Sequence, residues 1–492
     1  MKQRQRRPWA RCALLAALAL GPGAAPAQEP AEGWQRTGAR LRLGAESVAL
    51  PDGERMGLVG ASHLLDLQPG LCAGPAVYGA ATGERGGLFV VGAEAAWCLR
   101  TDGPLRLQAG LFVGGGGGGA APVGGGLMLR PHVDLLFDAG RWSAGVSLSR
   151  VSFPSGEIAS TQLGLVVEVP TTFAHRAPGA APVAGPAGTG LGFERVLAVA
   201  GAYLPPSGSL ANGGAPLASR IATVGLRAER SLAGPLYAGV ETNGAASGAA
   251  GYAEVLAQAG WRLPLADGRI ALGARVALGM GGGGAVPVGG GLLLKAAADA
   301  ELGLTPALGL ALEAGWARAP QGSFSAPFAS LALRWDLEAA GGAPAQTAWQ
   351  VFALGVETYH AAARKVGPAQ SVHNVVLRMD RFVGAQVYLS AQVHSAYGGD
   401  AGGFAVGLFG LGAQWQVLPG WRLGAELLAG AAGGGGVAVG SGTVVQPMAY
   451  AIANLSRALS LRLAAGRILA VDGPLSSTAA DLTLTYAYGV AR

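Results

Sequence analysis

Along most of the chain, apolar and polar residues alternate with a period of two. In the last segment, Leu482 and Leu484 alternate with Asp481, Thr483 and Thr485. Successive side chains of a β-strand point to opposite faces of a sheet, so this rhythm predicts strands with one apolar and one polar face. The same alternation recurs in segments 127–138, 162–169 and 331–337.

Between residues 194 and 337 the pattern predicts eight strands. They span 194–204, 220–232, 236–243, 251–265, 269–280, 291–304, 307–318 and 327–337. The connections alternate between short turns, such as 233–235, and longer loops, such as 205–219. This alternation predicts an up-and-down antiparallel order, with short turns at one end and longer loops at the other.

One unit occurs three times in the chain. A glycine string followed by a valine, further glycines and an apolar run occupies 114–130 and 281–295, with a weaker copy at 433–446. The shared valines Val123, Val288 and Val439 are 165 and 151 residues apart. A period of this length is that of a small domain or of one third of a large one. We predict repeats of about eight strands at 28–170, 193–337 and 348–492, joined by a Pro/Ala/Gly-rich linker at 171–192 and a second linker at 338–347.

The composition indicates that the predicted strands lie in a membrane. Charged residues make up 13% of the chain, against roughly 25% in an ordinary soluble domain. One face of each longer strand is apolar for about ten residues, the length of a tilted strand across a bilayer, and apolar-out, polar-in alternation is the pattern of a membrane barrel. The alternative, a secreted soluble β-protein, would leave these apolar faces in water, where they would aggregate.

Membrane helices fit the sequence less well. The longest uncharged stretch, 107–129, contains ten glycines and one proline, and each glycine costs about 1 kcal/mol of helix propensity. The fold class that we expect is therefore all-β.

The basic charge is concentrated at the N-terminus. Five of the 35 Lys and Arg residues lie in the first eleven positions, and the other 30 face 29 Asp and Glu. Residues 1–27 combine this basic stretch with a short apolar run and a small-residue end, Ala25-Pro26-Ala27, which predicts a cleaved export signal. Without a basic face on the remaining chain, nucleic acid is not an expected partner.

On these features the sequence resembles Gram-negative outer-membrane β-barrel proteins as a class. The resemblance implies a location in the bacterial outer membrane, contact with its lipid, and passage through periplasmic chaperones and the barrel-insertion machinery. Such barrels carry aromatic girdles at both membrane interfaces. The candidates are Trp97, Trp261, Trp335, Trp415, Tyr486 and Tyr488.

Three repeats of eight strands allow two architectures. Small inward residues such as Gly110, Gly273 and Gly424 would leave space inside the wall, which favours one wide barrel of 24 strands over three barrels whose interiors are filled. The alternative of three tandem eight-stranded barrels is supported by the linkers, because 171–192 is much longer than a turn.

Several charged residues fall on the predicted inner face. They are mixed in sign, which argues against strong ion selectivity, and they could equally be hydrogen-bonded partners across neighbouring strands. The candidates are Arg130, His132, Asp134, Arg275, Lys295, Asp299, Glu301 and Arg334.

Two cysteines of the exported chain are also candidates for an interaction. Cys72 and Cys98 flank a turn centred near residues 84–85 at almost equal distance. Antiparallel pairing would place them opposite one another near the periplasmic end, and in an oxidising compartment this predicts a disulfide with a stapling role.

Signals of catalysis are weak. His394 and Ser395 are adjacent and point to opposite faces of a strand, His132 and Asp134 lack further metal ligands, and the 114–119 string lacks the helix of a phosphate-binding loop. We therefore expect no enzyme activity and no cofactor. The function that the sequence favours is a pore, either a diffusion channel or the outer-membrane conduit of an export system. The alternative is a structural or anchoring protein with filled lumens and no transport.

Overall fold

The computed structural model describes residues 33–100, 103–178, 180, 189–265, 268–337 and 347–491. The expected export signal at 1–27 and nearly all of the second linker, 338–346, lie outside the described residues. No helix in the described ranges is long and apolar enough to cross a membrane.

The described residues form 24 antiparallel strands and one short 3-10 helix, Pro51–Gly53. Barrel 1 consists of β1 Gln35–Ala49, β2 Arg55–Gln68, β3 Leu71–Thr82, β4 Phe89–Arg100, β5 Leu105–Gly117, β6 Leu127–Asp138, β7 Ser143–Ser152 and β8 Ala159–His175. Barrel 2 consists of β9 Arg195–Tyr203, β10 Ile221–Ser231, β11 Leu236–Ser247, β12 Ala253–Leu265, β13 Ile270–Gly282, β14 Leu292–Gly303, β15 Leu308–Arg318 and β16 Ser325–Asp336. Barrel 3 consists of β17 Thr347–Ala362, β18 Gln370–Phe382, β19 Val387–Gly398, β20 Ala405–Leu418, β21 Trp421–Gly433, β22 Thr443–Asn454, β23 Leu459–Ala470 and β24 Ser476–Ala491.

The predicted all-β fold with about eight antiparallel strands per repeat is confirmed, and the eight strands expected between 194 and 337 match β9 to β16 closely. The first linker starts later than predicted. Residues 171–175 continue β8, where Thr171 pairs with Ala39 and His175 with Gln35 of β1.

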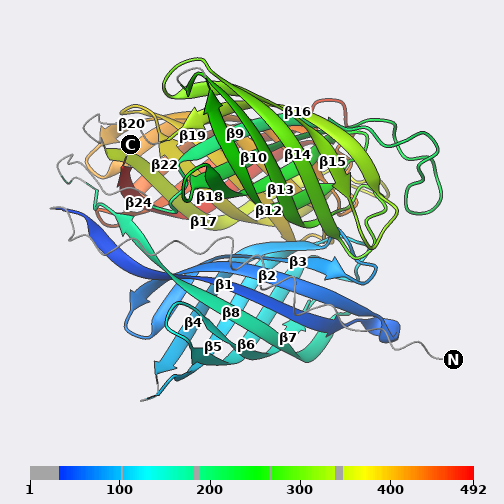
Figure 1. Ribbon diagram of the computed structural model, residues 1–492, viewed down its shortest axis with the longest axis horizontal. Helices are drawn as coiled ribbons and strands as arrows, with labels where there is room; N and C mark the ends of the chain where they lie inside the picture. Colours follow the sequence, from blue (N-terminus) through cyan, green and yellow to red (C-terminus); the bar gives the residue numbers. More distant parts are fainter. Residues whose placement is uncertain are drawn as a thin grey trace.

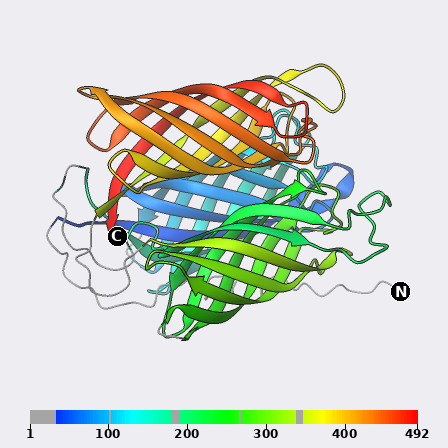
Figure 2. The ribbon, with the colours of Figure 1, turned by 90° about the horizontal axis from the view of Figure 1, so that it is seen from above.

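Strand pairing closes each repeat on itself. β8 pairs with β1, β16 with β9 and β24 with β17, so the hydrogen-bonded order is three closed rings of eight strands. The favoured ring of 24 would need β8 to pair with β9 and β16 with β17. The pairing thus differs from that expectation and follows the three-barrel alternative. Figures 1 and 2 show the barrels side by side, barrel 1 in blue and cyan, barrel 2 in green, and barrel 3 in yellow to red.

The inward glycines do not leave the space that a wide ring was expected to have. A Cβ atom on Gly110 would lie under 3.0 Å from the His132 ring, and one on Gly424 would lie as close to the Tyr450 ring. Gly273 is covered in the same way by the Asp299 carboxylate. These glycines make room for a large side chain from the neighbouring strand, so they mark filled positions and not empty space.

The connections follow the predicted alternation. Turns such as 69–70, 232–235 and 419–420 lie at one end of the barrels, here called the short-turn end. Loops such as 204–220 and the glycine-rich 283–291 lie at the opposite, long-loop end. Each strand therefore runs between the short-turn end and the long-loop end of its barrel.

The outer faces of the barrels are apolar. Leu163 of barrel 1, Leu312 of barrel 2 and Leu463 of barrel 3 are each more than 60% exposed, and alternate positions along the same strands face inward. A surface this apolar is the one that a barrel presents to hydrocarbon, because in water it would aggregate.

The three barrels touch through backbone at the long-loop end, in a cyclic arrangement. Equivalent glycines of the three repeats have φ angles of 97°, 105° and 117°, and a Cβ atom on any of them would lie under 3.0 Å from a carbonyl oxygen of another barrel. These contacts join Gly126 to Ala396, Gly291 to Ala80 and Gly442 to Ala245. Because each barrel uses one surface toward one neighbour and a different surface toward the other, the contacts close into a pseudo-threefold ring.

Hydrogen bonds accompany the glycine contacts. The Gly86 amide donates to the Gly289 carbonyl at 2.8 Å, between barrels 1 and 2. The equivalent Gly402 amide donates to the Gly124 carbonyl at 3.0 Å, between barrels 3 and 1. The repeated glycine strings were expected as loops or strand ends where backbone packs closely. The structure shows that the partner of this packing is the next barrel.

Candidate functional site

The interior of barrel 1 is occupied by a network of ion pairs. Arg42 lies at its centre, with its guanidinium 3.0 Å from Glu94, 2.5 Å from Asp134 and 3.5 Å from Glu168. His132 lies 3.3 Å from Glu94 and 3.1 Å from Asp134. All five side chains are almost completely buried. Such a network is stable only if the charges are paired, because each charge has lost its water.

Two further pairs extend the barrel 1 network toward both ends. Arg130 contacts Glu46 at 2.8 Å on the long-loop side of Arg42. Arg106 contacts Glu168 at 2.8 Å on the short-turn side. The inner cross-section of barrel 1 is therefore filled along much of its length by paired side chains.

Barrel 2 has a similar filling from different residues. Arg275 contacts Glu313 at 2.6 Å and Glu241 at 2.8 Å. Lys295 lies 2.8 Å from Glu241 and 2.5 Å from Glu254. Nearer the short-turn end, three arginines converge on one carboxylate, Glu301. The distances to Glu301 are 2.6 Å from Arg195, 2.9 Å from Arg262 and 3.0 Å from Arg334.

In barrel 3 the filling centres on Glu426. Its carboxylate lies 2.5 Å from Arg378 and 2.8 Å from Arg462, and it accepts a hydrogen bond from the Tyr388 hydroxyl at 2.9 Å. Arg462 also pairs with Asp481 at 2.7 Å. Toward the long-loop end, a separate pair of buried groups, His394 and Glu357, lies 2.6 Å apart.

The structure places the eight predicted inner-face charges inside the barrels, in two groups. Arg130, His132 and Asp134 belong to the barrel 1 network, and the other five belong to barrel 2. Asp299 and Arg334 are half-buried near the short-turn end, whereas the other six are buried. Of the two roles left open for these residues, the ion pairs formed by all of them except Asp299 match that of partners across strands.

Sequence reasoning missed most of the partners. It selected no charge from barrel 3, and it overlooked the central residues Arg42, Glu94 and Glu241. The sequence did carry a signal for them, because they occupy polar positions of the apolar–polar alternation. Arg42 and Glu46, for example, are both buried on the inner face of β1. The alternation predicts that a side chain points into the barrel, but it does not identify the residue on another strand with which that side chain pairs.

The two cysteines are free thiols in the structure. The register of β3 and β4 places Cys72 opposite Ala96, and the amide of Cys98 bonds the Gly70 carbonyl at 2.6 Å. The two residues are thus diagonal and not directly opposite, as the count from the turn had suggested. The Cys98 Sγ lies 3.1 Å from Gln108 Oε1, and the Cys72 Sγ lies 3.5 Å from the Ala96 carbonyl.

The aromatic candidates fall into two sets. Trp97, Trp261 and Trp415 lie exposed on the outer faces, near the short turns of barrels 1, 2 and 3. Trp335 is half-buried near the same end. Exposed Trp142 and Trp421, which were not among the candidates, also lie next to short turns.

The two tyrosines do not have the expected position. Tyr488 is buried in a cluster between barrels 3 and 1, with its ring 5.0 Å from that of Phe173. Tyr486 is half-buried beside it, and its hydroxyl lies 3.4 Å from the His175 ring. At the short-turn end, the outward face of β24 packs against barrel 1. The two tyrosines therefore contact protein there and not the membrane–water interface that was expected.

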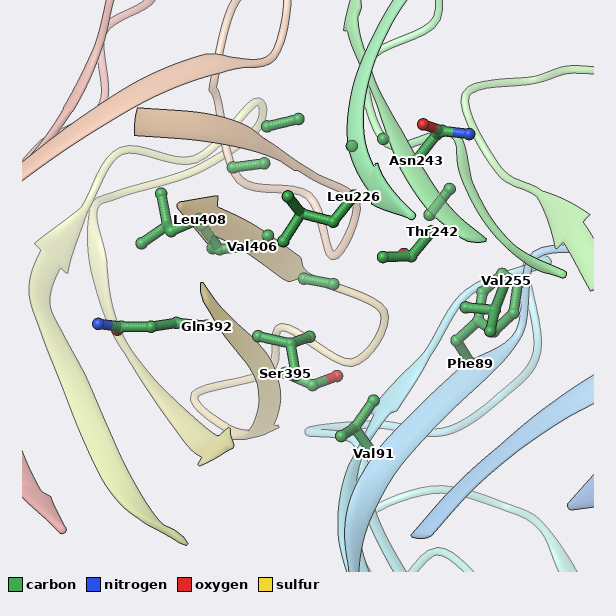
Figure 3. A pocket seen from close by; sticks show the side chains of 18 of the residues that line it. Phe89, Val91, Leu226, Thr242, Asn243, Val255, Gln392, Ser395, Val406 and Leu408 are labelled. Carbon is green, nitrogen blue, oxygen red and sulfur yellow. The ribbon is translucent and has the colours of Figure 1, made fainter. Parts of the chain in front are cut away.

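A cavity of about 390 Å³ lies between the three barrels. Each barrel contributes outward residues to its wall, including Val91 of barrel 1, Val255 of barrel 2 and Leu377 of barrel 3. Figure 3 shows the space between the blue, green and yellow strands. Glycines of the long-loop end, among them Gly87, also line it. The cavity therefore lies close to the pseudo-threefold axis, and the inward residues Val406 and Leu408 of barrel 3 also line it.

The described residues contain no group of three or more His, Cys, Asp or Glu side chains arranged to hold a metal ion. Outside the strands, one carboxylate has a distinct environment. The amide and hydroxyl of Ser441 donate to Asp472 at 3.0 and 2.8 Å, and these hydrogen bonds lower the pKa of Asp472. This contact braces the 471–475 loop against the glycine-rich loop of barrel 3.

Closed antiparallel barrels with an apolar outer face, a polar interior, short turns at one end and longer loops at the other define a class. The chain has the fold of the outer-membrane β-barrel proteins. No protein-family model matches the sequence, and no curated protein sequence matches it.

Solved structures of that class show a distant likeness. OccK1 (OpdK) of Pseudomonas aeruginosa is 11% identical, with a TM-score of 0.23 over 94% of this chain and 100% of that chain. The siderophore receptor PiuA of Acinetobacter baumannii is 8% identical, with a TM-score of 0.28 over 94% and 82% of the two chains. The ferric enterobactin receptor PfeA of Pseudomonas aeruginosa is 12% identical, with a TM-score of 0.28 over 92% and 81%. These values are too low to carry a functional inference.

Proposed function

We propose that this chain is a structural protein of the bacterial outer membrane, without transport or enzyme activity. Its three barrels would be embedded side by side in lipid as filled bodies. The observation that carries this proposal is the set of buried ion pairs inside each barrel, centred on Arg42, Arg275 and Glu426. The proposal corresponds to the structural alternative and not to the pore that the sequence favoured.

The size of each ring supports a closed lumen. The interior of an eight-stranded barrel is just wide enough for side chains to fill it. Here that space holds long arginine, glutamate and tyrosine side chains whose polar ends meet in the middle. A water path would have to separate pairs such as Arg42 and Asp134, which lie 2.5 Å apart.

Pairing also makes the filling persistent. Removing one partner of a buried ion pair costs about 3–5 kcal/mol, because the other charge is left without water or counterion. Several pairs share members, as Glu241 does with Arg275 and Lys295. Opening one lumen would therefore break several contacts together.

Single-channel recording in planar bilayers tests the proposal. The full chain is folded in detergent, reconstituted into lipid vesicles and fused with the bilayer. We expect no current steps of the size that an open diffusion porin gives in the same bilayers, because buried ion pairs occupy the interior of each barrel. Flotation of the vesicles on a density gradient after a urea wash, which strips adsorbed protein, shows that the protein remaining in the lipid fraction has inserted.

Reproducible large current steps from protein that floats with the vesicles would overturn the proposal and support the pore. Failure to float would overturn the membrane location itself. The two outcomes are read from different measurements.

A further inference from the structure

We propose that the cavity between the three barrels binds the acyl chain of a membrane phospholipid. The inference rests on the proposed membrane location, but not on whether the lumens conduct. It follows from the wall of the cavity, from its continuity with the outer surface and from one position at which the threefold equivalence is broken.

The wall of the cavity is mainly apolar. Val77 and Phe89 line it from barrel 1, Leu226 from barrel 2, and Phe352 and Phe409 from barrel 3. Its volume of about 390 Å³ exceeds the roughly 150 Å³ of an engineered apolar cavity that stays free of water and binds benzene. A space of this kind gains contacts when hydrocarbon enters and offers little to water.

The polar residues of the wall are mostly turned into the barrels. Figure 3 shows the amide groups of Asn243 and Gln392 directed away from the space, and they bond Glu241 at 2.8 Å and Ser390 at 3.0 Å inside their barrels. Arg378 is bound to Glu426 in the lumen of barrel 3. Thr242, which is exposed, and Ser395, which is buried, are polar side chains at outward strand positions of the wall. The wall therefore offers no charged group to a phosphate, and the occupant is the apolar part of a lipid.

The cavity is continuous with the outer apolar surface. Along β20, the outward positions run from Gly407 and Phe409, which line the cavity, through Leu411 to Trp415, which are both exposed. The outward face of β4 likewise leads from Val91 in the wall toward exposed Trp97. On β12 it leads from Val255 in the wall toward exposed Trp261. A chain lying along such a row would reach the cavity from the surrounding lipid without crossing a polar zone.

Position 407 enlarges the cavity on one side. Val91, Val255 and Gly407 are equivalent in the three repeats, because each lies four residues after one of the matching loop glycines Gly87, Gly251 and Gly403, whose φ angles are 93°, 91° and 90°. A Cβ atom on Gly407 would have no neighbour within 4 Å. Most strand glycines of this protein are covered by a side chain or by backbone, so the open space at Gly407 is the place where a ligand has no competing protein group.

The test is a comparison of Gly407→Trp with Ala300→Trp. Gly407 lines the cavity and a Cβ atom there has no neighbour within 4 Å, whereas Ala300 is an exposed residue on the outer face of β14 and does not line the cavity. Each protein is folded in detergent, incubated with dioleoylphosphatidylethanolamine, washed with lipid-free detergent, and examined by native mass spectrometry. Circular dichroism shows that strand content is unchanged.

We expect the wild type and Ala300→Trp to retain bound phospholipid after washing, and Gly407→Trp to lose it. Equal retention by all three folded proteins would show that the lipid binds the outer surface, which overturns the inference. No retention by the folded wild type would overturn it as well. If Gly407→Trp does not fold, Gly407→Leu replaces it with the same expected result. The conductance measurement is independent of each of these outcomes.

Discussion

Two kinds of residue fill the interior of each barrel: long side chains, many of them charged, and the glycines beside which they pack. Charged side chains fill the lumen in pairs, as Arg275 does with Glu313 and Glu241, and glycines on the same inner face make room for them or for rings. Gly412 is covered by the ring of Tyr388, whose hydroxyl reaches Glu426 at 2.9 Å. Small and large inward residues are therefore complementary, which is how a narrow ring is filled.

The substitution Arg42→Leu should destabilise the protein by about 3–5 kcal/mol, because it leaves Glu94, Asp134 and Glu168 short of a counterion in a dry interior. The measurement is urea unfolding in lipid vesicles, followed by tryptophan fluorescence. The matched control is Arg141→Leu in the exposed 139–142 turn, which should change stability by no more than about 0.5 kcal/mol. If both variants unfold at the same urea concentration, the Arg42 network does not hold the lumen together.

At the scale of elements, strands could be predicted but their closure could not. The two-residue period depends on local burial, and it located β9 to β16 within a few residues. Whether β8 turns back to β1 or continues to β9 depends on contacts far apart in sequence, such as Thr171 with Ala39. The sequence also does not show whether the space beside an inward glycine such as Gly110 is empty or is filled by a ring from the neighbouring strand.

The glycine-rich loops illustrate the same limit. Their repetition predicted close backbone packing, but the partner of Gly291 is Ala80 in another barrel. Likewise, the alternation along β24 predicted that Tyr488 lies on the outer face. That barrel 1 packs against this face and buries Tyr488 could not be predicted from the local sequence. The alternation identified charged inner residues such as Arg130, but Glu168 and Asp481, which lie in segments with the same alternation, were not selected as candidates.

The substitution Gly291→Val tests the inter-barrel contact. A side chain there meets the Ala80 carbonyl and must adopt a φ of 105°. The strained backbone alone costs about 1–3 kcal/mol, and the clash between barrels adds to it. The matched control is Gly420→Val, because Gly420 has a φ of 79° and a Cβ atom added there would have no neighbour within 4 Å.

Urea unfolding in vesicles compares the two glycine variants. We expect Gly291→Val to be clearly less stable than Gly420→Val, because only the former separates barrels 1 and 2. Equal losses of stability would mean that the glycine contact contributes nothing beyond its backbone conformation.

For the whole molecule, the three repeats act as the subunits of a trimer joined in one chain. Equivalent surfaces meet cyclically, so each barrel uses both of its contact surfaces within the molecule. The arrangement encloses a central apolar space and leaves the lipid-facing surfaces of the barrels on the outside. The proposed structural function depends on this closure, because three filled rings would form a solid body in the membrane, whereas one ring of 24 strands would form a channel.

The most direct test of this account is a density map of the full chain in lipid nanodiscs, viewed in cross-section at mid-height of the strands. We predict three separate rings of eight strands, each with side-chain density across its lumen, arranged around one central space. A single ring of 24 strands around an open lumen would contradict the account.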